Sequence, residues 1–185
     1  MSGQLKPLPE LLAEYDRALA YTDELWRDLR PDEVVWRPHQ DFSPIGWHLG
    51  HQAHVAHFMI RNLTAAEPSP DPELGELLDS ASPEKSRGAL PTVDRLTRFR
   101  ETVAERVRAR ISDIAGRRVS APEQLTVIAG HLLTAIINHE YQHDQWISEV
   151  RLQNLGYPLP DDPDTGTICR VDGYLLLDPL TNRGD

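Results

Sequence analysis

The sequence predicts an all-α fold, a four-helix bundle followed by a short C-terminal β-hairpin or irregular tail. Two observations predict it. Four long segments repeat apolar residues at steps of three and four, the period of a helix that buries one face. No convincing strand pattern occurs before the C-terminal part of the chain. A chain of 185 residues is most simply one domain, so we assign residues 1–160 to the bundle and 161–185 to the tail.

The first two helices are both marked by proline near their starts, where proline is tolerated. The first spans Pro7–Leu29, and we expect Arg30-Pro31-Asp32-Glu33 to break it. The connector 34–42 contains a further proline, which argues against a helix there. Ser43-Pro44 supplies an N-cap hydroxyl and a first-turn proline, so the second helix begins at Pro44 and continues to about Ala65.

The third helix, Thr92–Ile114, follows a proline-rich excursion in which one short helix is expected near Glu73–Leu78. Its exposed side is rich in arginine, and ion pairs with Glu101 and Glu105 are the simplest interpretation of those charges. An anionic substrate or an acidic partner is the alternative, and the sequence does not show whether the arginines face a site.

The fourth and longest helix begins at Ala121-Pro122-Glu123 and reaches about Asn154, where Leu155-Gly156 ends it. In the tail, Asp172-Gly173 separates two short β-prone segments, 168–171 and 174–177, which is a hairpin signal. Because two strands alone are marginally stable, we expect this hairpin to pack on the bundle or on a partner subunit.

The composition excludes several classes of protein. A net charge of −10 argues against a general nucleic-acid or membrane-surface binder. No apolar run approaches membrane-spanning length, and the first residues lack a signal-peptide core, which favours a cytoplasmic location. Cys169 is the single cysteine, so an intrachain disulfide and a cysteine-rich metal site are both excluded.

The histidines are clustered, and their helical positions separate them. His139 and His143 share one stripe of the fourth helix, and a pair of imidazoles one turn apart can hold a metal ion. Two core histidines bonded to their neighbours are the alternative. In the second helix His51 and His48 lie within the apolar side. The two other histidines of that helix are expected at the edge of the apolar side or in solvent, namely His54 and His57.

Two metal sites are compatible with this pair. In the first, His139-Glu140-Tyr141-Gln142-His143 is the H-E-x-x-H motif of zinc proteases, with Glu140 as general base. The extended form of that motif fails, because Trp146 and Glu149 occupy its glycine and third-histidine positions.

In the second, a facing helix supplies His51 as third ligand, and Glu140 becomes an outer neighbour of the site or a solvated residue. Asp144 and Gln145 would orient a ligand or cap the polar side of the helix. The further candidates for contact with a ligand or substrate are Trp47, His48, Glu140 and Gln145.

Two motifs resemble the DinB-like (YfiT-like) metalloenzyme family. Ser43-Pro44-Ile45-Gly46-Trp47-His48-Leu49-Gly50-His51 resembles the start of its second helix, and it is closest to the branch that supplies the N-terminal domain of ergothioneine-type sulfoxide synthases. The stretch from His139 to Gln145, with Arg151 and Leu155-Gly156-Tyr157-Pro158, resembles its last helix and exit. The resemblance covers most of Glu10 to Pro158.

The resemblance implies an up–down–down–up bundle, often a homodimer, with a divalent zinc, nickel or iron ion on three histidines. The family's ligands map onto His51, His139 and His143. Relatives include thiol-dependent transferases and isomerases that use bacillithiol or mycothiol, and iron-dependent sulfoxide synthases. The chain lacks the large C-terminal domain that completes the sulfoxide synthase site, and the resemblance supplies no role for Asp161–Asp185.

The leading functional hypothesis is therefore a metal-dependent enzyme, a thiol-dependent S-transferase or isomerase acting on a small-molecule substrate with a low-molecular-weight thiol as cosubstrate. The arginines of the third helix could bind the thiol's carboxylates. The competing hypothesis is a non-catalytic metal-binding or dimerisation bundle, and a zincin-type metalloprotease is third. Cys169 lies outside the motif helices and is not assigned as a nucleophile.

Overall fold

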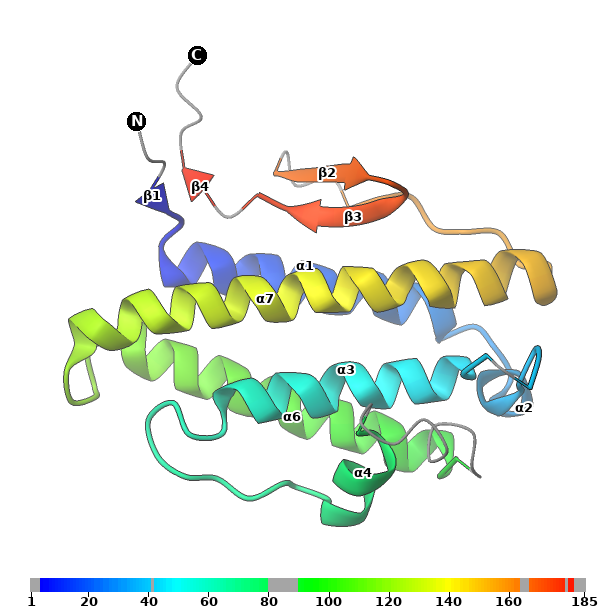
Figure 1. The fold of residues 1–185 in the computed structure, drawn as a ribbon, viewed down its shortest axis with the longest axis horizontal. Helices are drawn as coiled ribbons and strands as arrows, with labels where there is room; N and C mark the ends of the chain where they lie inside the picture. Colours follow the sequence, from blue (N-terminus) through cyan, green and yellow to red (C-terminus); the bar gives the residue numbers. More distant parts are fainter. Residues whose placement is uncertain (1–3, 41, 80–89, 164–166, 179, 182–185) are drawn as a thin grey trace.

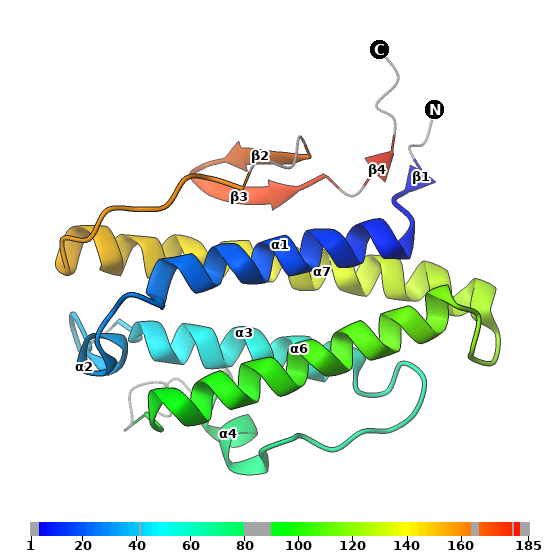
Figure 2. The ribbon, with the colours of Figure 1, turned by 180° about the vertical axis from the view of Figure 1, so that it is seen from behind.

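The structure is a computed structural model that describes residues 4–40, 42–79, 90–163, 167–178 and 180–181. Its four long helices form two layers (Figure 1). One layer contains α1 (Leu8–Trp26) and α7 (Pro122–Glu149), and the other contains α3 (Ile45–Ile60) and α6 (Val93–Ala115). In both Figure 1 and Figure 2, α1 and α7 run in one direction and α3 and α6 in the other. The predicted helical bundle is confirmed, with up–down–down–up topology.

The core lies where the four apolar stripes meet. Apolar side chains on the facing sides of the helices are almost fully buried, among them Leu11, Leu25, Val107, Ile111 and Leu133. Burial of each such side chain stabilises the fold by roughly 1.5–3 kcal/mol relative to its exposure to water. The position of each helix is thus set mainly by its apolar face.

The segment predicted to break the first helix forms a short helix of its own, α2 (Pro31–Val35). Pro31 occupies its first turn, where a missing N–H costs nothing, and the Glu33 carboxylate accepts a hydrogen bond from the Arg30 N–H at 2.9 Å. The predicted break is present, because α1 ends at Trp26. The prediction that the connector 34–42 has no helix was wrong for its first two residues, because Val34 is buried. The second long helix also ends earlier than predicted, at Ile60 rather than near Ala65.

The last helix ends in one π-helical turn, η1 (Val150–Asn154), in which the Leu155 N–H donates to the Val150 carbonyl at 3.1 Å. Arg151 locks this end onto α1. Its guanidinium donates to the Leu25 carbonyl at 3.0 Å, to both oxygens of Asp28 at 2.6 and 2.9 Å, and to the Pro158 carbonyl at 2.7 Å. The predicted extent of the helix, to about Asn154, therefore includes this turn.

The predicted hairpin is present, with β2 (Ile168–Val171) antiparallel to β3 (Tyr174–Leu177). Asp172 and Gly173 both have positive φ, 51° and 89°, as a two-residue hairpin turn requires. The hairpin packs on the bundle, since Leu175 and Leu177 are buried and the Leu177 N–H donates to Asn138 Oδ1 of α7 at 2.8 Å. Beside it, β1 (Gln4–Leu5) pairs with β4 (Leu180–Thr181).

The arginines of α6 do not pair as predicted. Across the described ranges no ion pair joins them to Glu101 or Glu105; most reach acids on other segments. Arg106 and Arg110 both pair with Glu67, at 3.1 and 2.9 Å. Carboxylates on neighbouring segments lie closer to these arginines than the i,i+4 partners do. The two ion pairs of Glu67 therefore attach the segment between α3 and α4 to α6. Within the described part of the chain, no helix combines the length and apolarity needed to cross a membrane.

Candidate metal centre

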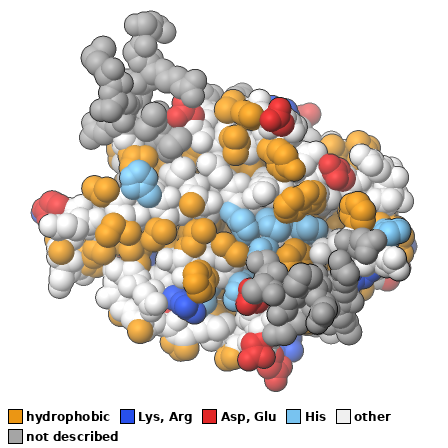
Figure 3. Space-filling model, in the orientation of Figure 1, with side chains coloured by type: hydrophobic (Ala, Val, Ile, Leu, Met, Phe, Trp, Pro, Cys, Tyr) orange, Lys and Arg blue, Asp and Glu red, His pale blue; other side chains and the backbone are white. Residues whose placement is uncertain are grey.

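Three histidines from two helices meet on one face of the bundle. His51 comes from α3, and His139 and His143 come from successive turns of α7. Each offers one ring nitrogen, and these three atoms lie within 4.8 Å of one another, which is a separation that a single metal ion can bridge. His51 and His143 are each 5% exposed, whereas His139 is half-buried. Figure 3 shows histidine side chains gathered on this face of the molecule.

Hydrogen bonds orient two of the three rings. His51 Nδ1 lies 2.7 Å from the Leu78 carbonyl oxygen, which only accepts, so Nδ1 carries the proton and Nε2 keeps its lone pair. His143 Nδ1 lies 2.8 Å from His48 Nδ1. In both cases Nδ1 is engaged and Nε2 is the ring atom left for a cation. Such an outer hydrogen bond is the usual support of a metal-binding imidazole.

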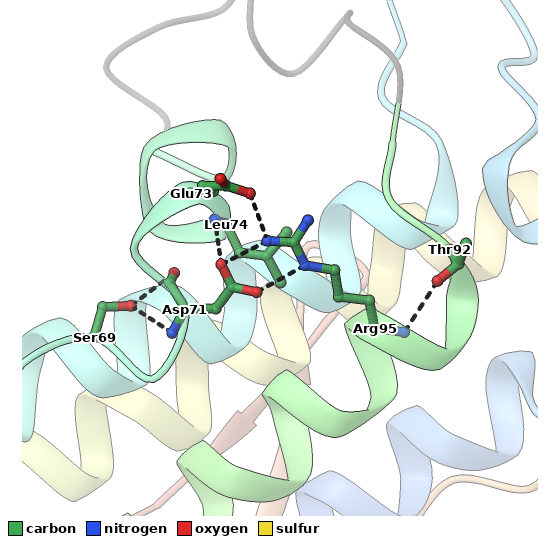
Figure 4. Close-up of polar contacts among 6 residues, drawn as sticks. All are labelled: Ser69, Asp71, Glu73, Leu74, Thr92 and Arg95. Carbon is green, nitrogen blue, oxygen red and sulfur yellow. Dashed lines mark hydrogen bonds and ion pairs between the residues drawn. The ribbon is translucent and has the colours of Figure 1, made fainter.

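The Leu78 carbonyl is itself positioned by the short helix α4 (Pro72–Leu77), close to the one predicted near Glu73–Leu78. Asp71 caps this helix by accepting from the Leu74 N–H at 3.1 Å, and Arg95 of α6 donates to both Asp71 oxygens at 2.7 and 2.8 Å (Figure 4). Arg95 also reaches Glu73 at 2.9 Å. This bidentate ion pair attaches α4 to α6 and so fixes the segment that orients His51.

Gly50 allows that segment to approach α3. A Cβ at this position would lie 2.6 Å from Leu78 Cδ2 and 2.7 Å from Leu78 Cδ1, closer than real Cβ contacts. Glycine in a helix interior costs about 1 kcal/mol relative to alanine, so its presence here indicates a packing reason. The absent side chain is what lets Leu78 pack beside His51.

Burial keeps these imidazoles neutral. It lowers the pKa of His139 to about 4 and that of His48 to about 3, and it lowers the pKa of His51 and His143 below the ordinary value of 6.5. A neutral ring has the lone pair that a metal ion requires, so no proton has to be removed near neutral pH.

Two tryptophans enclose one side of the cluster. The Trp47 ring stacks on His51 with centroids 4.5 Å apart, and Trp146 meets His143 edge-on at 4.8 Å. The Trp47 indole N–H is buried and has no hydrogen-bond partner among the residues that the structure describes. These rings exclude water from the imidazoles and raise the strength of any charge interaction there.

Glu140 and Asp144 point away from the histidines into the core, which corrects the expectation that they are solvated or cap the polar side of the helix. Glu140 is 2% exposed and lies 3.8 Å from Arg100 Nη1. Asp144 is 1% exposed and accepts hydrogen bonds from Thr22 Oγ1 at 2.8 Å and Gln52 Nε2 at 3.1 Å. Burial raises the pKa of both carboxyl groups.

Gln145 lies apart from the cluster. Its side chain donates to Glu149 at 3.3 Å and lines a cavity of about 240 Å³ between the bundle and the hairpin. His57 is buried, 3% exposed, although the helical period placed it outward. The chain after α3 covers that side of the helix, where the Arg106–Glu67 ion pair and a 2.8 Å bond from Arg106 to the Pro68 carbonyl hold it.

Sequence reasoning missed the Leu78 carbonyl, Gln52 and Arg100. Every residue type carries a carbonyl, so nothing in the sequence distinguishes the one at Leu78. Arg100 is one of many arginines on its helix, and only the three-dimensional structure shows that it is 7% exposed. The signal that could have found the Leu78 contact is Gly50, a glycine within a helix.

Comparison with known proteins identifies the family of the chain. A family model described as the DinB superfamily matches residues 14–147, a range that includes His51, His139 and His143. A comparison with curated proteins found no match. The matched range covers most of the chain and contains all four long helices, except for the first turns of α1 and the last residues of α7. The chain therefore belongs to the DinB superfamily.

Proposed function

We propose that this protein is a metal-dependent enzyme in which His51, His139 and His143 hold a divalent zinc, nickel or iron ion. The proposed reaction is transfer or isomerisation on a small-molecule substrate, with a low-molecular-weight thiol as cosubstrate. The observation that carries the metal assignment is the meeting of three neutral imidazoles within 4.8 Å, two of them oriented by outer hydrogen bonds.

The donor set fits such an ion. Imidazole suits zinc, nickel and iron, and three protein ligands leave coordination positions for water or substrate, the pattern of catalytic rather than structural sites. When bound, the ion supplies Lewis acidity that favours the deprotonated form of a thiol or water. His48 and the Leu78 carbonyl hold two rings in place, and the Trp47 indole N–H is a candidate donor to a substrate.

The position of Glu140 argues against the zinc-protease alternative. That mechanism needs a carboxylate beside the open coordination position. Glu140 instead lies in the core beside Arg100, and one of its oxygens is sealed from solvent. The competing non-catalytic hypothesis, in which the ion only pins α3 to α7, uses the same three ligands and is separated from the enzyme by activity alone.

Elemental analysis of protein purified without an affinity tag tests the ligand set. We expect stoichiometric metal in the wild type and its loss in His51→Ala and His139→Ala. His131→Ala is the matched control, because His131 is an exposed histidine of the same helix. Wild-type protein without metal would remove the basis of the proposal, and full retention by His51→Ala would show that the third ligand is misassigned.

Conjugation assays then separate an enzyme from a metal-binding module. Metal-loaded wild type is screened with low-molecular-weight thiols and electrophiles, with His139→Ala as the blank. Thiol consumption above that blank supports the transferase. No consumption above the blank with any thiol that leaves the protein folded and metal-loaded favours the non-catalytic metal-binding bundle.

We also propose that the protein is a homodimer. Apolar side chains are exposed on the α3 and α7 helices, namely Phe58 (57%), Val127 (56%) and Ile128 (48%). Figure 3 shows hydrophobic side chains along the face where α7 lies. Light scattering on the eluting protein measures the mass, and a monomer at micromolar concentration would contradict the proposal.

A further inference from the structure

A groove of about 550 Å³ lies between α1 and α6, and it contains a buried arginine that the proposed function does not use. Its described lining residues come from these two helices and from Arg27, the residue directly after α1. Figure 2, the view from behind, places α1 and α6 in front, whereas the histidines come from α3 and α7, which are in front in Figure 1. The groove is therefore on the opposite face of the bundle from the candidate metal centre.

Arg100 lines this groove and is 7% exposed. Its Nη1 atom donates to the Leu49 carbonyl at 2.9 Å and to Gln52 Oε1 at 3.1 Å. The nearest carboxylate, Glu140, lies 3.8 Å from the same Nη1 atom, beyond hydrogen-bond length. One end of the guanidinium is thus tied to the core, and the charge is only partly compensated there.

The other edge of the guanidinium, Nε and Nη2, has no partner among residues 4–40, 42–79, 90–163 and 167–178. Both atoms keep some solvent-exposed surface, so this edge of the guanidinium reaches the groove. The N–H groups of Nε and Nη2 are parallel donors that match the two oxygens of a carboxylate. Water or a ligand in the groove must therefore accept from these donors, because a buried cation with unused donors is costly.

The other charged residues that line the groove do not pair with Arg100. Within the described residues no ion pair joins it to Asp23, Glu101 or Glu105. Arg27 pairs with Asp23 at 2.6 Å, and Arg108 pairs with Asp16 at 2.8 Å, so these surface pairs are already complete. The apolar part of the wall comes from Leu19, Trp26 and Ala104. A ligand of this groove therefore combines one anionic planar group with an apolar body.

We propose that the groove between α1 and α6 binds a small monocarboxylate with an apolar chain or ring, whose carboxylate accepts from the Nε and Nη2 edge of Arg100. A cavity of 550 Å³ is in the range of small-molecule sites, and its apolar wall favours a ligand with an alkyl or aryl part. This site is independent of any metal on the histidines.

Calorimetric titration of the metal-free, 185-residue protein with hexanoate tests the proposal. We expect saturable binding of one hexanoate per chain. Arg100→Lys keeps the charge but loses the paired donors, and it should weaken binding about tenfold, the equivalent of one charge-assisted hydrogen bond. Ala104→Leu fills the groove without changing Arg100 and should weaken binding at least as much. Ala115→Leu, at an exposed position of the same helix, is the control and should bind as the wild type does.

Three further titrations test the chemistry of the ligand and its place on the protein. Hexanamide, which has the same chain without the charge, should bind at least about tenfold more weakly than hexanoate. Inorganic phosphate binding more tightly than hexanoate would overturn the carboxylate assignment. His139→Ala should bind hexanoate normally, and loss of binding there would place the ligand on the histidines. Absence of saturable binding to wild type, or unchanged binding to Ala104→Leu, would refute the groove site, whatever the metal content of the protein.

Discussion

The substitution Gly50→Ala tests whether the close packing of Leu78 against α3 supports His51, because alanine improves helix propensity but worsens this packing. An alanine Cβ at this position would lie 2.6 and 2.7 Å from the two methyl groups of Leu78 and 3.1 Å from Leu96 Cδ2. Leu78 is fully buried, so its side chain cannot simply turn into solvent. We expect the segment that carries Leu78 to move away from α3, so that its carbonyl moves away from His51 Nδ1, from which it accepts at 2.7 Å.

The magnitude follows from two opposing terms. Replacing a helical glycine by alanine stabilises by roughly 1 kcal/mol through the backbone. Overpacking a buried site costs roughly 1–3 kcal/mol. Gly130→Ala is the matched variant, because its Cβ would lie 3.5 Å from the nearest atom, Leu5 Cδ1, an ordinary contact. The backbone term is common to both variants, so Gly50→Ala should be about 1–3 kcal/mol less stable than Gly130→Ala.

Urea unfolding of the metal-free proteins measures this difference, and competition with a chromophoric chelator measures zinc affinity. We expect Gly50→Ala to bind zinc roughly 10- to 100-fold more weakly, because an outer hydrogen bond of a ligand is lost. Gly130→Ala should keep the wild-type affinity. If Gly50→Ala is as stable as Gly130→Ala and binds zinc normally, the close approach of Leu78 does not support His51 and the reasoning is wrong.

Three further predictions use other contacts. His48→Phe removes the partner of His143 Nδ1, so zinc affinity should fall roughly 10- to 100-fold by the same competition assay while the circular dichroism spectrum stays unchanged. Asp71→Ala removes both the α4 cap and the partner of Arg95, and it should cost about 1–2 kcal/mol in urea unfolding at pH 7. The Arg95 hydrogen bonds lower the pKa of Asp71 below 3.8, so this contribution is complete above pH 3.8 and is lost as the pH falls through the folded pKa; wild type and variant should converge in stability in acid, and a constant difference would contradict the ion pair. Arg151→Met leaves the Leu25 and Pro158 carbonyls without a donor and should cost roughly 2–3 kcal/mol, whereas an unchanged urea midpoint would show that η1 does not depend on this arginine.

Much of the fold could be predicted from the sequence, because helical period and end signals act locally. The apolar stripes of the long helices, the proline starts and the Asp172-Gly173 turn each depend on neighbouring residues alone. The predictions that were wrong concern positions whose structure depends on contacts with a distant segment of the chain. α2 forms because Val34 has a buried position to occupy. His57 is buried because the segment after α3, which contains Glu67, folds back over that helix.

The histidine cluster was predicted more completely than its surroundings. Position on an apolar stripe identifies His139 and His143 and leaves His48 and His51 as candidates on the facing helix, since facing stripes must meet in a bundle. The resemblance of Ser43–His51 to the DinB-like family adds the reason to choose His51. Their roles as metal ligands stay a prediction until metal is measured. The apolar stripe does not predict where the other side of α7 lies. Glu140 and Asp144 on that side are buried in the core, because Arg100 of α6 lies beside Glu140 and Thr22 of α1 donates to Asp144.

The buried polar residues of the core help to determine the order in which the four helices pack. Apolar stripes and connector lengths are compatible with more than one order of helices. Each helix, however, contributes one member of a linked polar set, Thr22 from α1, Gln52 from α3, Arg100 from α6 and Asp144 from α7. Any arrangement that exchanges two helices would bury at least one of these groups without its partner, at a cost of several kcal/mol. The set therefore widens the energy gap between the native bundle and its competitors, which apolar packing alone would leave narrow.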